Sequence, residues 1–263
     1  MRPGNYAVQS ETYDETRQAS PTILGALRDA LRPAGGGRLL DVAGGTGNYA
    51  APLAADGFRV VVADAEPAML ARAAAKLIPG SCVGADGAAL PFREASFDCA
   101  TLVSAFHLFG AREAKVRALR EVRRVLRGGP LVMQVFTREN LVPLFTHEYF
   151  DHPIHQEVRE TEAEHVALLE EAGFVRVTAR RLAYAGVEDG SLSALQTDAE
   201  LVSDERNLRN TSYWQRMDEP SRRAGLERLR RDLATGELER RVRRGRELAA
   251  TWGHVTVLVA WPA

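Results

Sequence analysis

The order of strands and helices between residues 37 and 135 constrains the fold more than any other feature of this sequence. Short runs of aliphatic and β-branched residues predict buried strands, and the stretches between them have the spacing of amphipathic helices. The strands are expected in GRLLDVAG, FRVVVAD, SCVGADGAALPF, FDCATLVSAFHLF and GGPLVMQVF. The helices are expected in NYAAPLAADG, EPAMLARAAAKLI and AREAKVRALREVRRVL. This alternation predicts a parallel sheet covered on both faces, with ligands at the carboxyl ends of its strands.

The pattern changes after residue 135. A capping box, Thr161-Glu-Ala-Glu164, predicts the start of the helix HVALLEEAG, and FVRVTARRLAY follows as a strand. A last strand is expected in HVTVLVAWPA. The stretch between these two strands includes a predicted helix from Asp218 to Thr235, whose leucines recur on one face.

Composition excludes several classes of protein. With 263 residues and 45% hydrophobic residues, the chain is long and apolar enough for one large α/β domain with an elaboration. A net charge of -1 provides no field for nucleic acid, and we interpret the ten arginines between Arg222 and Arg246 as a solvated face because acidic residues lie among them. Two cysteines, no signal-like start and no apolar stretch of about 20 residues predict a reduced, cytoplasmic protein.

The glycine loop DVAGGTGNYA, residues 41–50, follows the first predicted strand. Gly45, Gly47 and Ala50 fit the dinucleotide fingerprint G-x-G-x-x-[GA], which by itself is weak evidence for a nicotinamide cofactor. Asp41 lies at the end of that strand, where a carboxylate would repel a pyrophosphate and attract an ammonium or sulfonium group. The sequence therefore favours a cationic ligand.

Two more acidic residues follow the next two strands. Asp64 is placed to accept hydrogen bonds from ribose hydroxyls, and Asp86 is placed to accept one from an adenine amino group. Ala65, Met69 and Ala85 would supply apolar contact to the adenine ring. Acidic residues at three successive strand ends suit a nucleoside with a positively charged tail.

Five segments together resemble the motifs of class I S-adenosylmethionine-dependent methyltransferases, of the small-molecule type similar to ubiquinone and menaquinone methyltransferases. The segments are LLDVAGGTGNYA, VVVADAEPAML, GADGAALPFREASFD, LREVRRVLRGGPLVM and LLEEAGFVRV. The resemblance covers about residues 6–182. It implies an α/β fold, a doubly wound seven-stranded and mostly parallel sheet, whose antiparallel last strand lies between the fifth and sixth, with helical cap elements. It also implies four parts: an N-terminal helical lid (1–30), a Rossmann-like cofactor-binding core (31–182), an insertion that caps the substrate (183–252) and the last core strand (253–263).

The resemblance implies the site residues one by one. Asp41, Gly45 and Gly47 match the motif that holds the methionine part of S-adenosylmethionine, Asp64 the ribose ligand, Asp86 with Gly87 the adenine contact, and Ser104 a position beside the methyl donor. Tyr13, in a Tyr-Asp pair, is similar to a residue that closes over the cofactor, with packing of the helix as its alternative. Ala43 stands where the family usually has its first glycine, and its methyl group is expected to fit if φ is negative.

The residues that would contact the methyl acceptor are harder to predict from the sequence. His107 is the best-placed candidate for a general base, with packing as its alternative. Aromatic residues of the predicted cap are expected either to line the acceptor pocket or to pack: Phe145, Tyr149, Phe150, Tyr213 and Trp214. His147, His152 and His155 lack regular ligand spacing, so no metal is expected.

The predicted function is methyl transfer from S-adenosylmethionine to an O, N or C nucleophile of a small molecule, with no nucleic-acid or membrane partner and with the oligomeric state open. Basic residues that are nearly all arginine suggest a GC-rich bacterial genome, and from this a role in secondary metabolism. Two alternatives remain: a protein of the same fold that binds the nucleoside without transferring methyl, and a nicotinamide-dependent oxidoreductase, which Asp41 opposes.

Overall fold

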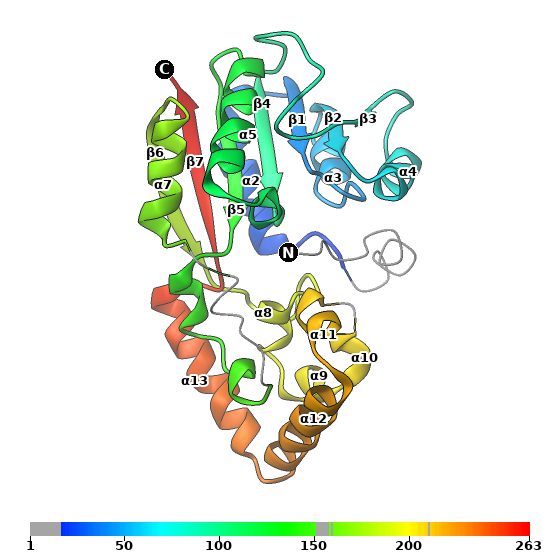
Figure 1. Ribbon diagram of the computed structural model, residues 1–263, viewed down its shortest axis with the longest axis vertical. Helices are drawn as coiled ribbons and strands as arrows, with labels where there is room; N and C mark the ends of the chain where they lie inside the picture. The colour runs from blue at the N-terminus through cyan, green and yellow to red at the C-terminus, as the bar shows by residue number, and fades with distance from the viewer. Residues whose placement is uncertain (1–16, 151–157, 159, 210) are drawn as a thin grey trace.

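A computed structural model describes residues 17–150, 158, 160–209 and 211–263 of the chain. A sheet with helices on both faces forms one part of the molecule, and a group of helices forms the other (Figure 1). We call the second part the helical lobe and define it as residues 137–150 and 187–252. The chain thus enters this lobe twice, once after the fifth strand and once after the sixth.

The sheet has seven strands in the order β3-β2-β1-β4-β5-β7-β6. β7 pairs antiparallel with both β5 and β6, whereas the pairs among β1 to β5 are parallel. The expected seven-stranded sheet, with its antiparallel last strand between the fifth and sixth, is therefore confirmed. The strands are β1 (Arg38–Val42), β2 (Arg59–Asp64), β3 (Cys82–Gly84), β4 (Cys99–Val103), β5 (Leu131–Val135), β6 (Phe174–Leu182) and β7 (Val255–Pro262).

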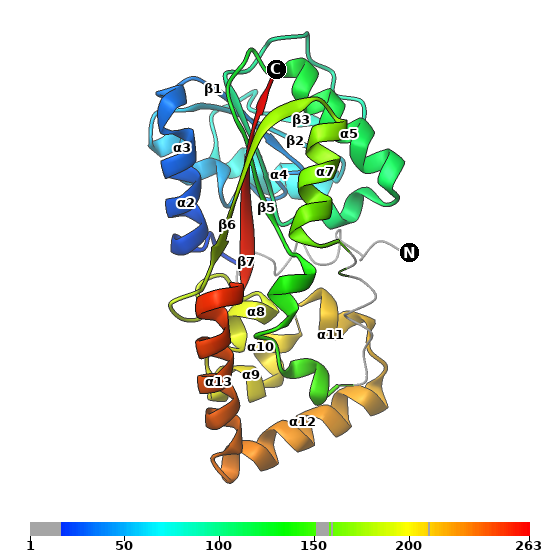
Figure 2. The ribbon, with the colours of Figure 1, turned by 90° about the vertical axis from the view of Figure 1, so that its left-hand side faces the viewer.

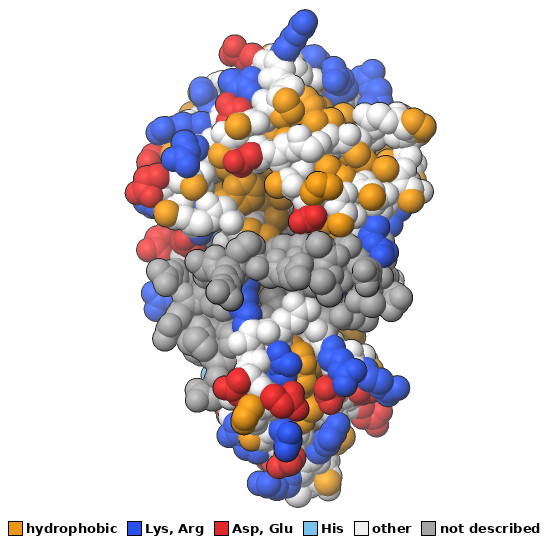
Figure 3. Space-filling view, turned by 45° about the vertical axis from the view of Figure 1, so that its right-hand side comes forward, with side chains coloured by type: hydrophobic (Ala, Val, Ile, Leu, Met, Phe, Trp, Pro, Cys, Tyr) orange, Lys and Arg blue, Asp and Glu red, His pale blue; other side chains and the backbone are white. Residues whose placement is uncertain are grey.

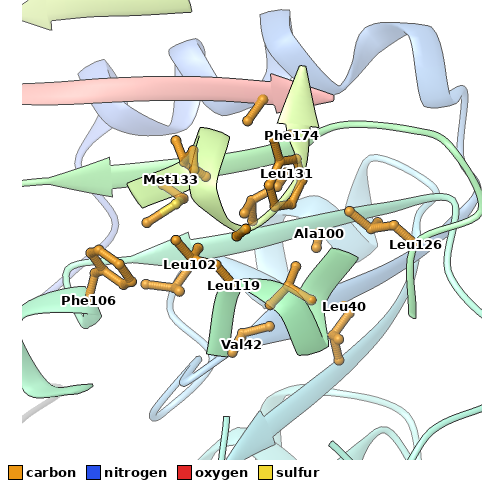
Figure 4. Close-up of a cluster of buried hydrophobic side chains, with 14 of the residues drawn as sticks. Leu40, Val42, Ala100, Leu102, Phe106, Leu119, Leu126, Leu131, Met133 and Phe174 are labelled. Atoms are coloured by element: carbon orange, nitrogen blue, oxygen red, sulfur yellow. The ribbon is translucent and has the colours of Figure 1, made fainter. Parts of the chain in front are cut away.

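Helices cover the two faces of the sheet from opposite sides (Figure 2). On one face lie α2 (Pro21–Leu31), α3 (Ala50–Ala55) and α4 (Pro67–Lys76), with η1 (Arg32–Ala34) after α2. On the other lie α5 (Arg112–Val125) and α7 (Glu162–Glu171), with η2 (Phe106–Phe109) at the end of β4. Successive strand residues point to opposite faces, so Leu39 joins the first core and Leu40 the second (Figure 4).

Part of the segment expected as an N-terminal lid forms helix α2, which packs against the sheet. Ile23, Leu27 and Leu31 on this helix are fully buried in the core that includes β5 and β7. Their spacing places one apolar stripe against the sheet, and Ser20 caps the helix by accepting a hydrogen bond from the amide of Ile23. Residues 21–31 are therefore part of the core, and residues 1–16 lie outside the described residues.

Local signals in the sequence explain several helix boundaries. Thr161 and Glu164 form the predicted capping box at the start of α7, each accepting a hydrogen bond from the other's amide. Pro67 occupies the first turn of α4, where its missing N–H costs no helical hydrogen bond. Gly57 follows α3 with φ +98°, a conformation that favours glycine. Such local chemistry explains why these helices were predictable.

The helical lobe has a hydrophobic core of its own. Phe150 makes edge-to-face contacts with Tyr213 and Trp214, each at 5.9 Å between ring centroids. On α12, Gly225 makes room for this ring, because a Cβ at that position would lie 2.0 Å from Phe150. The elements of the lobe are η3 (Arg138–Leu141), η4 (Thr146–Glu148), α8 (Leu192–Leu195), α9 (Ala199–Ser203), α10 (Glu205–Leu208), α11 (Ser212–Arg216), α12 (Glu219–Ala234) and α13 (Glu237–Trp252).

Charges of both signs are mixed over the outer surface of the helical lobe (Figure 3). On α13, Arg240 and Arg241 both pair with Glu237, at 2.7 and 3.3 Å. This mixture agrees with the interpretation of the arginine-rich segment as a solvated face. Among the described residues, no helix combines the length and the apolar composition that a membrane span needs.

Candidate functional site

A cavity of about 710 Å³ lies where the carboxyl ends of the parallel strands meet the helical lobe. The loops after β1, β2, β3 and β4 form one wall, which we call the strand-end wall and define as residues 43–49, 64–69, 85–88 and 103–105. The rest of the lining comes mainly from segments 106–117, 134–144, 158–165 and 184–213, which we call the distal wall. The size is that of a cavity for a ligand of a few hundred daltons.

Asp64 is held rigidly at the end of β2. Its Oδ2 accepts a hydrogen bond from the Gly45 amide at 2.9 Å, and its Oδ1 accepts one from the Glu66 amide at 2.8 Å. The side chain lines the cavity. Because a carboxylate oxygen can accept more than one hydrogen bond, both oxygens retain capacity for hydroxyl groups of a ligand.

Asp41 lies beneath the glycine loop and does not form part of the cavity wall. It is 2% exposed, and its Oδ1 accepts a hydrogen bond from Thr101 at 2.8 Å. Burial, with a smaller contribution from the charge of Asp64, raises the pKa of Asp41 to about 7. Asp41 therefore lies beneath the loop and not on the cavity wall, because in β1 this side chain points to the same face as Leu39.

The glycine loop fits closely over Asp41. A Cβ on Gly44 would lie 2.4 Å from Oδ2 of Asp41, so a glycine at this position lets the loop rest on the carboxylate. Ala43 has φ +52°, in the left-handed region. The expectation that its φ would be negative is thus wrong, and the alanine is held in a conformation that costs an L-residue about 1–2 kcal/mol.

The remaining loop glycines have different surroundings. Gly45 lines the cavity with φ +57°. Gly47 is buried with φ +75°, and a Cβ there would lie 3.3 Å from Ala73 of α4, so this glycine serves the packing of the loop on that helix. Gly87 lines the cavity, where a Cβ would lie 2.5 Å from the ring of Phe109.

The predicted adenine contacts gather at one end of the strand-end wall. Met69 is 4% exposed and lines the cavity, as do Ala65, Ala85 and Asp86. Oδ1 of Asp86 accepts a hydrogen bond from the Ala88 amide at 2.9 Å, which orients the carboxyl group. An apolar side chain beside a fixed acceptor is the arrangement that a flat, amino-bearing ring requires.

Ser104 and His107 line the middle of the cavity. Ser104 has φ +56°, and its hydroxyl donates a hydrogen bond to Oε1 of Gln134 at 2.5 Å. His107, in η2, is exposed, so the alternative that it is a core packing residue is not what the structure shows. Its position on the wall leaves it accessible to a ligand.

The predicted acceptor residues divide into two groups. Tyr213 lines the cavity and also packs in the core of the helical lobe. The other four belong to that core and do not line the cavity, so for them packing is the observed role: Phe145, Tyr149, Phe150 and Trp214. The physical reason is that a small lobe needs large aromatic side chains to bury enough apolar surface.

Sequence reasoning missed polar groups on the distal wall. Tyr184 donates a hydrogen bond from its hydroxyl to Oδ2 of Asp189 at 3.1 Å, and both residues are buried and line the cavity. Burial, followed by the charge of Asp189, raises the pKa of Tyr184 well above its ordinary value. Gln134 and His165 also line the cavity. None of these residues belongs to a spacing pattern, so only the topology reveals them.

Some predicted residues cannot be placed. Tyr13, His152 and His155 lie outside the described residues. Within the described ranges, no group of three or more His, Cys, Asp or Glu side chains could hold a metal ion. His147 is half-buried in η4 of the helical lobe.

Residues 40–133 match a protein-family model described as a methyltransferase domain. Among curated proteins, the chain is 38% identical over 121 residues to a demethylmenaquinone methyltransferase of Beutenbergia cavernae, which covers 45% of this chain and 48% of that protein. It is 33% identical over 161 residues to the demethylmenaquinone methyltransferase of Clavibacter sepedonicus, which covers 56% of this chain and 64% of that protein. The chain thus matches about half to two thirds of the length of these relatives.

Solved structures resemble nearly the whole chain. Among them is a protein of Anabaena variabilis assigned as a methyltransferase of an antibiotic biosynthesis pathway, with a TM-score of 0.79 and 22% identity. The similarity covers 93% of this chain and 98% of the other, so it includes the helical lobe. At this identity the likeness supports the fold alone.

Proposed function

Because residues 40–133 match the model of a methyltransferase domain, we propose that this protein transfers a methyl group from S-adenosylmethionine to a small-molecule acceptor. The observation that carries the proposal is the convergence of Asp64, Asp86 and Ser104 on one wall of a single cavity. These residues follow three different strands, and the fold brings them together at the edge where parallel sheets bind ligands.

The strand-end wall fits the chemical groups of this cofactor. Asp64 would accept hydrogen bonds from the ribose hydroxyls, and Asp86 would accept one from the adenine amino group. Met69 would pack against the adenine ring, while the loop at Gly45 and the turn at Ser104 would hold the methionine part. When bound, S-adenosylmethionine supplies an electrophilic methyl group, so the main task of the protein is to hold the acceptor close and in line.

Asp41 would act through the loop that covers it. Its carboxyl group supports the glycine loop from below and sits next to Asp64, which raises its pKa. A positively charged ligand above the loop would favour the ionised form of Asp41 through the intervening backbone. This is an indirect electrostatic contribution, weaker than the contact expected from the sequence.

His107 is the candidate for a general base. An imidazole on the cavity wall can take a proton from an acceptor that must be deprotonated near neutral pH. The replacement His107→Ala tests the role, because loss of a base lowers turnover and leaves the affinity for S-adenosylhomocysteine unchanged. Equal loss of both would assign His107 to the binding or folding of the site instead.

The acceptor itself is proposed only as a small molecule. The names of the curated relatives favour a quinone precursor, whereas that of the Anabaena variabilis structure favours secondary metabolism. The family model ends at residue 133, and most residues of the distal wall, such as Tyr184 and Tyr213, lie beyond it. The shared domain therefore supports a common methyl donor better than a common acceptor.

Isothermal calorimetry against S-adenosylmethionine, S-adenosylhomocysteine and NADH tests the proposal. We expect micromolar binding of the first two and none of the third. Binding of NADH alone would favour the oxidoreductase alternative. Binding of both sulfur nucleosides, with no methylated product from a panel of quinols, phenols and amines analysed by mass spectrometry, would favour a protein that binds the nucleoside without transferring methyl.

A further inference from the structure

His165 is a nearly buried imidazole in the wall of the cavity. It lies in the first turns of α7, is 4% exposed and lines the cavity next to Phe106, whose ring centroid is 5.8 Å away. Its Nδ1 is 2.9 Å from the backbone oxygen of Thr161. Because a carbonyl oxygen can only accept, this contact places the ring proton on Nδ1.

The second ring nitrogen is then a hydrogen-bond acceptor. In a neutral imidazole protonated on Nδ1, Nε2 carries a lone pair. In the part of the chain that the structure describes, the hydrogen bond of this side chain is the one at Nδ1, and no donor is directed at Nε2. The side chain lines the cavity, so a ligand bound there lies beside the imidazole ring.

Burial of the His165 ring favours its neutral form. Burial lowers its pKa, and the ammonium of Lys115 on α5 acts in the same direction. The hydrogen bond to Thr161 and the carboxylates of Glu160 and Glu139 act in the opposite direction but do not outweigh these effects. Glu160 is itself paired with Lys115, and Glu164, one residue before His165, is turned to the amide of Thr161.

The imidazole nitrogens of His165 are not needed to satisfy the backbone hydrogen bonds of the helix. The backbone oxygen of Thr161 already accepts a hydrogen bond from the amide of His165 at 3.1 Å. A leucine or phenylalanine would therefore fill the same space without leaving that carbonyl unpaired. An imidazole at this position adds one feature that packing does not require, namely an acceptor atom directed at the cavity.

We propose that Nε2 of His165 accepts a hydrogen bond from the methyl acceptor, which is therefore an apolar molecule with a hydroxyl or N–H group. This inference rests on the proposed function, because it assumes that the distal wall binds the acceptor. Phe106 beside His165 supplies apolar contact, and Leu144 and Val158 are apolar residues that line the same cavity. A site that pairs its acceptor atom with a ligand donor discriminates against the analogue that lacks the donor, since that analogue leaves a buried polar atom unsatisfied.

A pair of matched probes tests the inference without the natural acceptor. The probes are 1-naphthol, which donates a hydrogen bond, and 1-methoxynaphthalene, which does not, each titrated into the protein saturated with S-adenosylhomocysteine. The measured quantity is the ratio of the two affinities in the wild type and in two variants. His165→Leu removes the acceptor atom, whereas His165→Gln retains an amide oxygen near the position of Nε2.

We expect the ratio of the two affinities, 1-naphthol over 1-methoxynaphthalene, to be about three- to tenfold larger in the wild type than in His165→Leu. This is the effect of one hydrogen bond. His165→Gln should restore part of the difference. In wild-type protein labelled with ¹⁵N at histidine, the His165 signals should show Nδ1 protonated and Nε2 unprotonated. The Nε2 signal should shift on addition of 1-naphthol and remain in place with the ether.

Equal ratios in the wild type and His165→Leu would overturn the inference, as would an Nε2 that carries the proton. The ¹⁵N measurement needs no variant, so it decides the matter even if His165→Leu does not fold. Calorimetry with S-adenosylhomocysteine distinguishes a failure of this inference from a failure of the proposed function. If the wild type binds it but the probe ratio is insensitive to His165, only this inference fails; if the wild type does not bind it, the proposed function fails first.

Discussion

The two walls of the cavity are built in different ways. The strand-end wall comes from one part of the sequence, and its carboxylates are held by backbone amides, as Asp64 is by Gly45 and Glu66. The distal wall combines segments that are far apart in the chain, and side chains supply its fixed contacts: the Tyr184 hydroxyl donates to Asp189, and the Tyr184 amide donates to Nδ1 of His254. The first wall thus depends mainly on backbone conformation, and the second depends on how side chains from distant segments pack.

This difference predicts that the two walls can be altered separately. Changes in the strand-end wall should affect the binding of the nucleoside, and changes in the core of the helical lobe should affect stability and acceptor binding.

The pH dependence of stability should reveal the buried carboxyl group under the glycine loop. The folded pKa of Asp41 is about 7, above its ordinary value of 3.8. The folded state therefore holds the proton in this window, and the free energy of unfolding falls as pH rises from 4 to 7, by about 2–4 kcal/mol. Urea unfolding at several pH values measures this.

Asp41→Asn is the matched control for that experiment, because an amide does not titrate. His254, whose pKa burial lowers to about 4, has the opposite effect on stability, since its contribution is lost as pH falls from 6.5 to 4. His254 is present in both proteins, so its effect cancels in the comparison. Identical pH profiles for the wild type and the variant would show that Asp41 is ionised throughout.

A methyl group at Gly225 should disturb the helical lobe alone. Its Cβ would lie 2.0 Å from the ring of Phe150, and this ring cannot move without displacing its aromatic neighbours. We expect Gly225→Ala to lower the free energy of unfolding by about 1–3 kcal/mol. The control is Gly186→Ala, where a Cβ would meet nothing within 4 Å. A parallel loss of affinity for S-adenosylhomocysteine would mean that the two walls are coupled.

Removal of the Asp64 carboxylate should affect chiefly the binding of the nucleoside. Asp64→Ala is expected to weaken binding of S-adenosylhomocysteine by about 1–3 kcal/mol, because charge-assisted hydrogen bonds are lost. Asp64→Asn, which keeps one acceptor oxygen, should lose less. Calorimetry measures both variants, and an unchanged dissociation constant for Asp64→Ala would place the ribose elsewhere.

Relief of the strained loop residue should give the smallest effect. Ala43→Gly removes the cost of a left-handed alanine but makes the unfolded chain more flexible, so we expect a net gain of about 0.5–1 kcal/mol. Ala95 has the same φ of +52° and lies outside the cavity wall. Ala95→Gly should therefore give the same gain in thermal unfolding, and only Ala43→Gly should also change the affinity for S-adenosylhomocysteine.

The parts of the molecule that could be predicted from sequence are those governed by local rules. Strand order and helix starts followed from periodicity and from caps such as Thr161 and Glu164, together with the resemblance to a known family. The conformation of Ala43 could not be derived, because an alanine gives no local signal for positive φ. The orientation of Asp41 depends on which face of β1 lies under the loop, and this is a property of the assembled sheet.

The residues around the expected acceptor pocket show most clearly what the sequence could not predict. An aromatic residue in a cap segment is equally suited to a core and to a pocket, and only packing decides that Phe150 is enclosed while Tyr213 reaches the cavity. The position of His165 on the cavity wall could not be predicted for a related reason. It lies inside a correctly predicted helix, and its importance depends on a neighbour, Phe106, that the topology places beside it.

The position of β7 also has a consequence for biosynthesis. On the ribosome, β1 to β5 emerge first and can pair with one another, but β6 has no neighbour until β7 has been translated, because β7 separates it from β5. The whole segment 187–252 is synthesised in this interval. During that time the nascent chain exposes the edges of both β5 and β6, which are surfaces prone to wrong pairing. Slow translation through this segment would lengthen the exposure, so we expect recovery of the native protein to depend on chaperones that bind nascent chains.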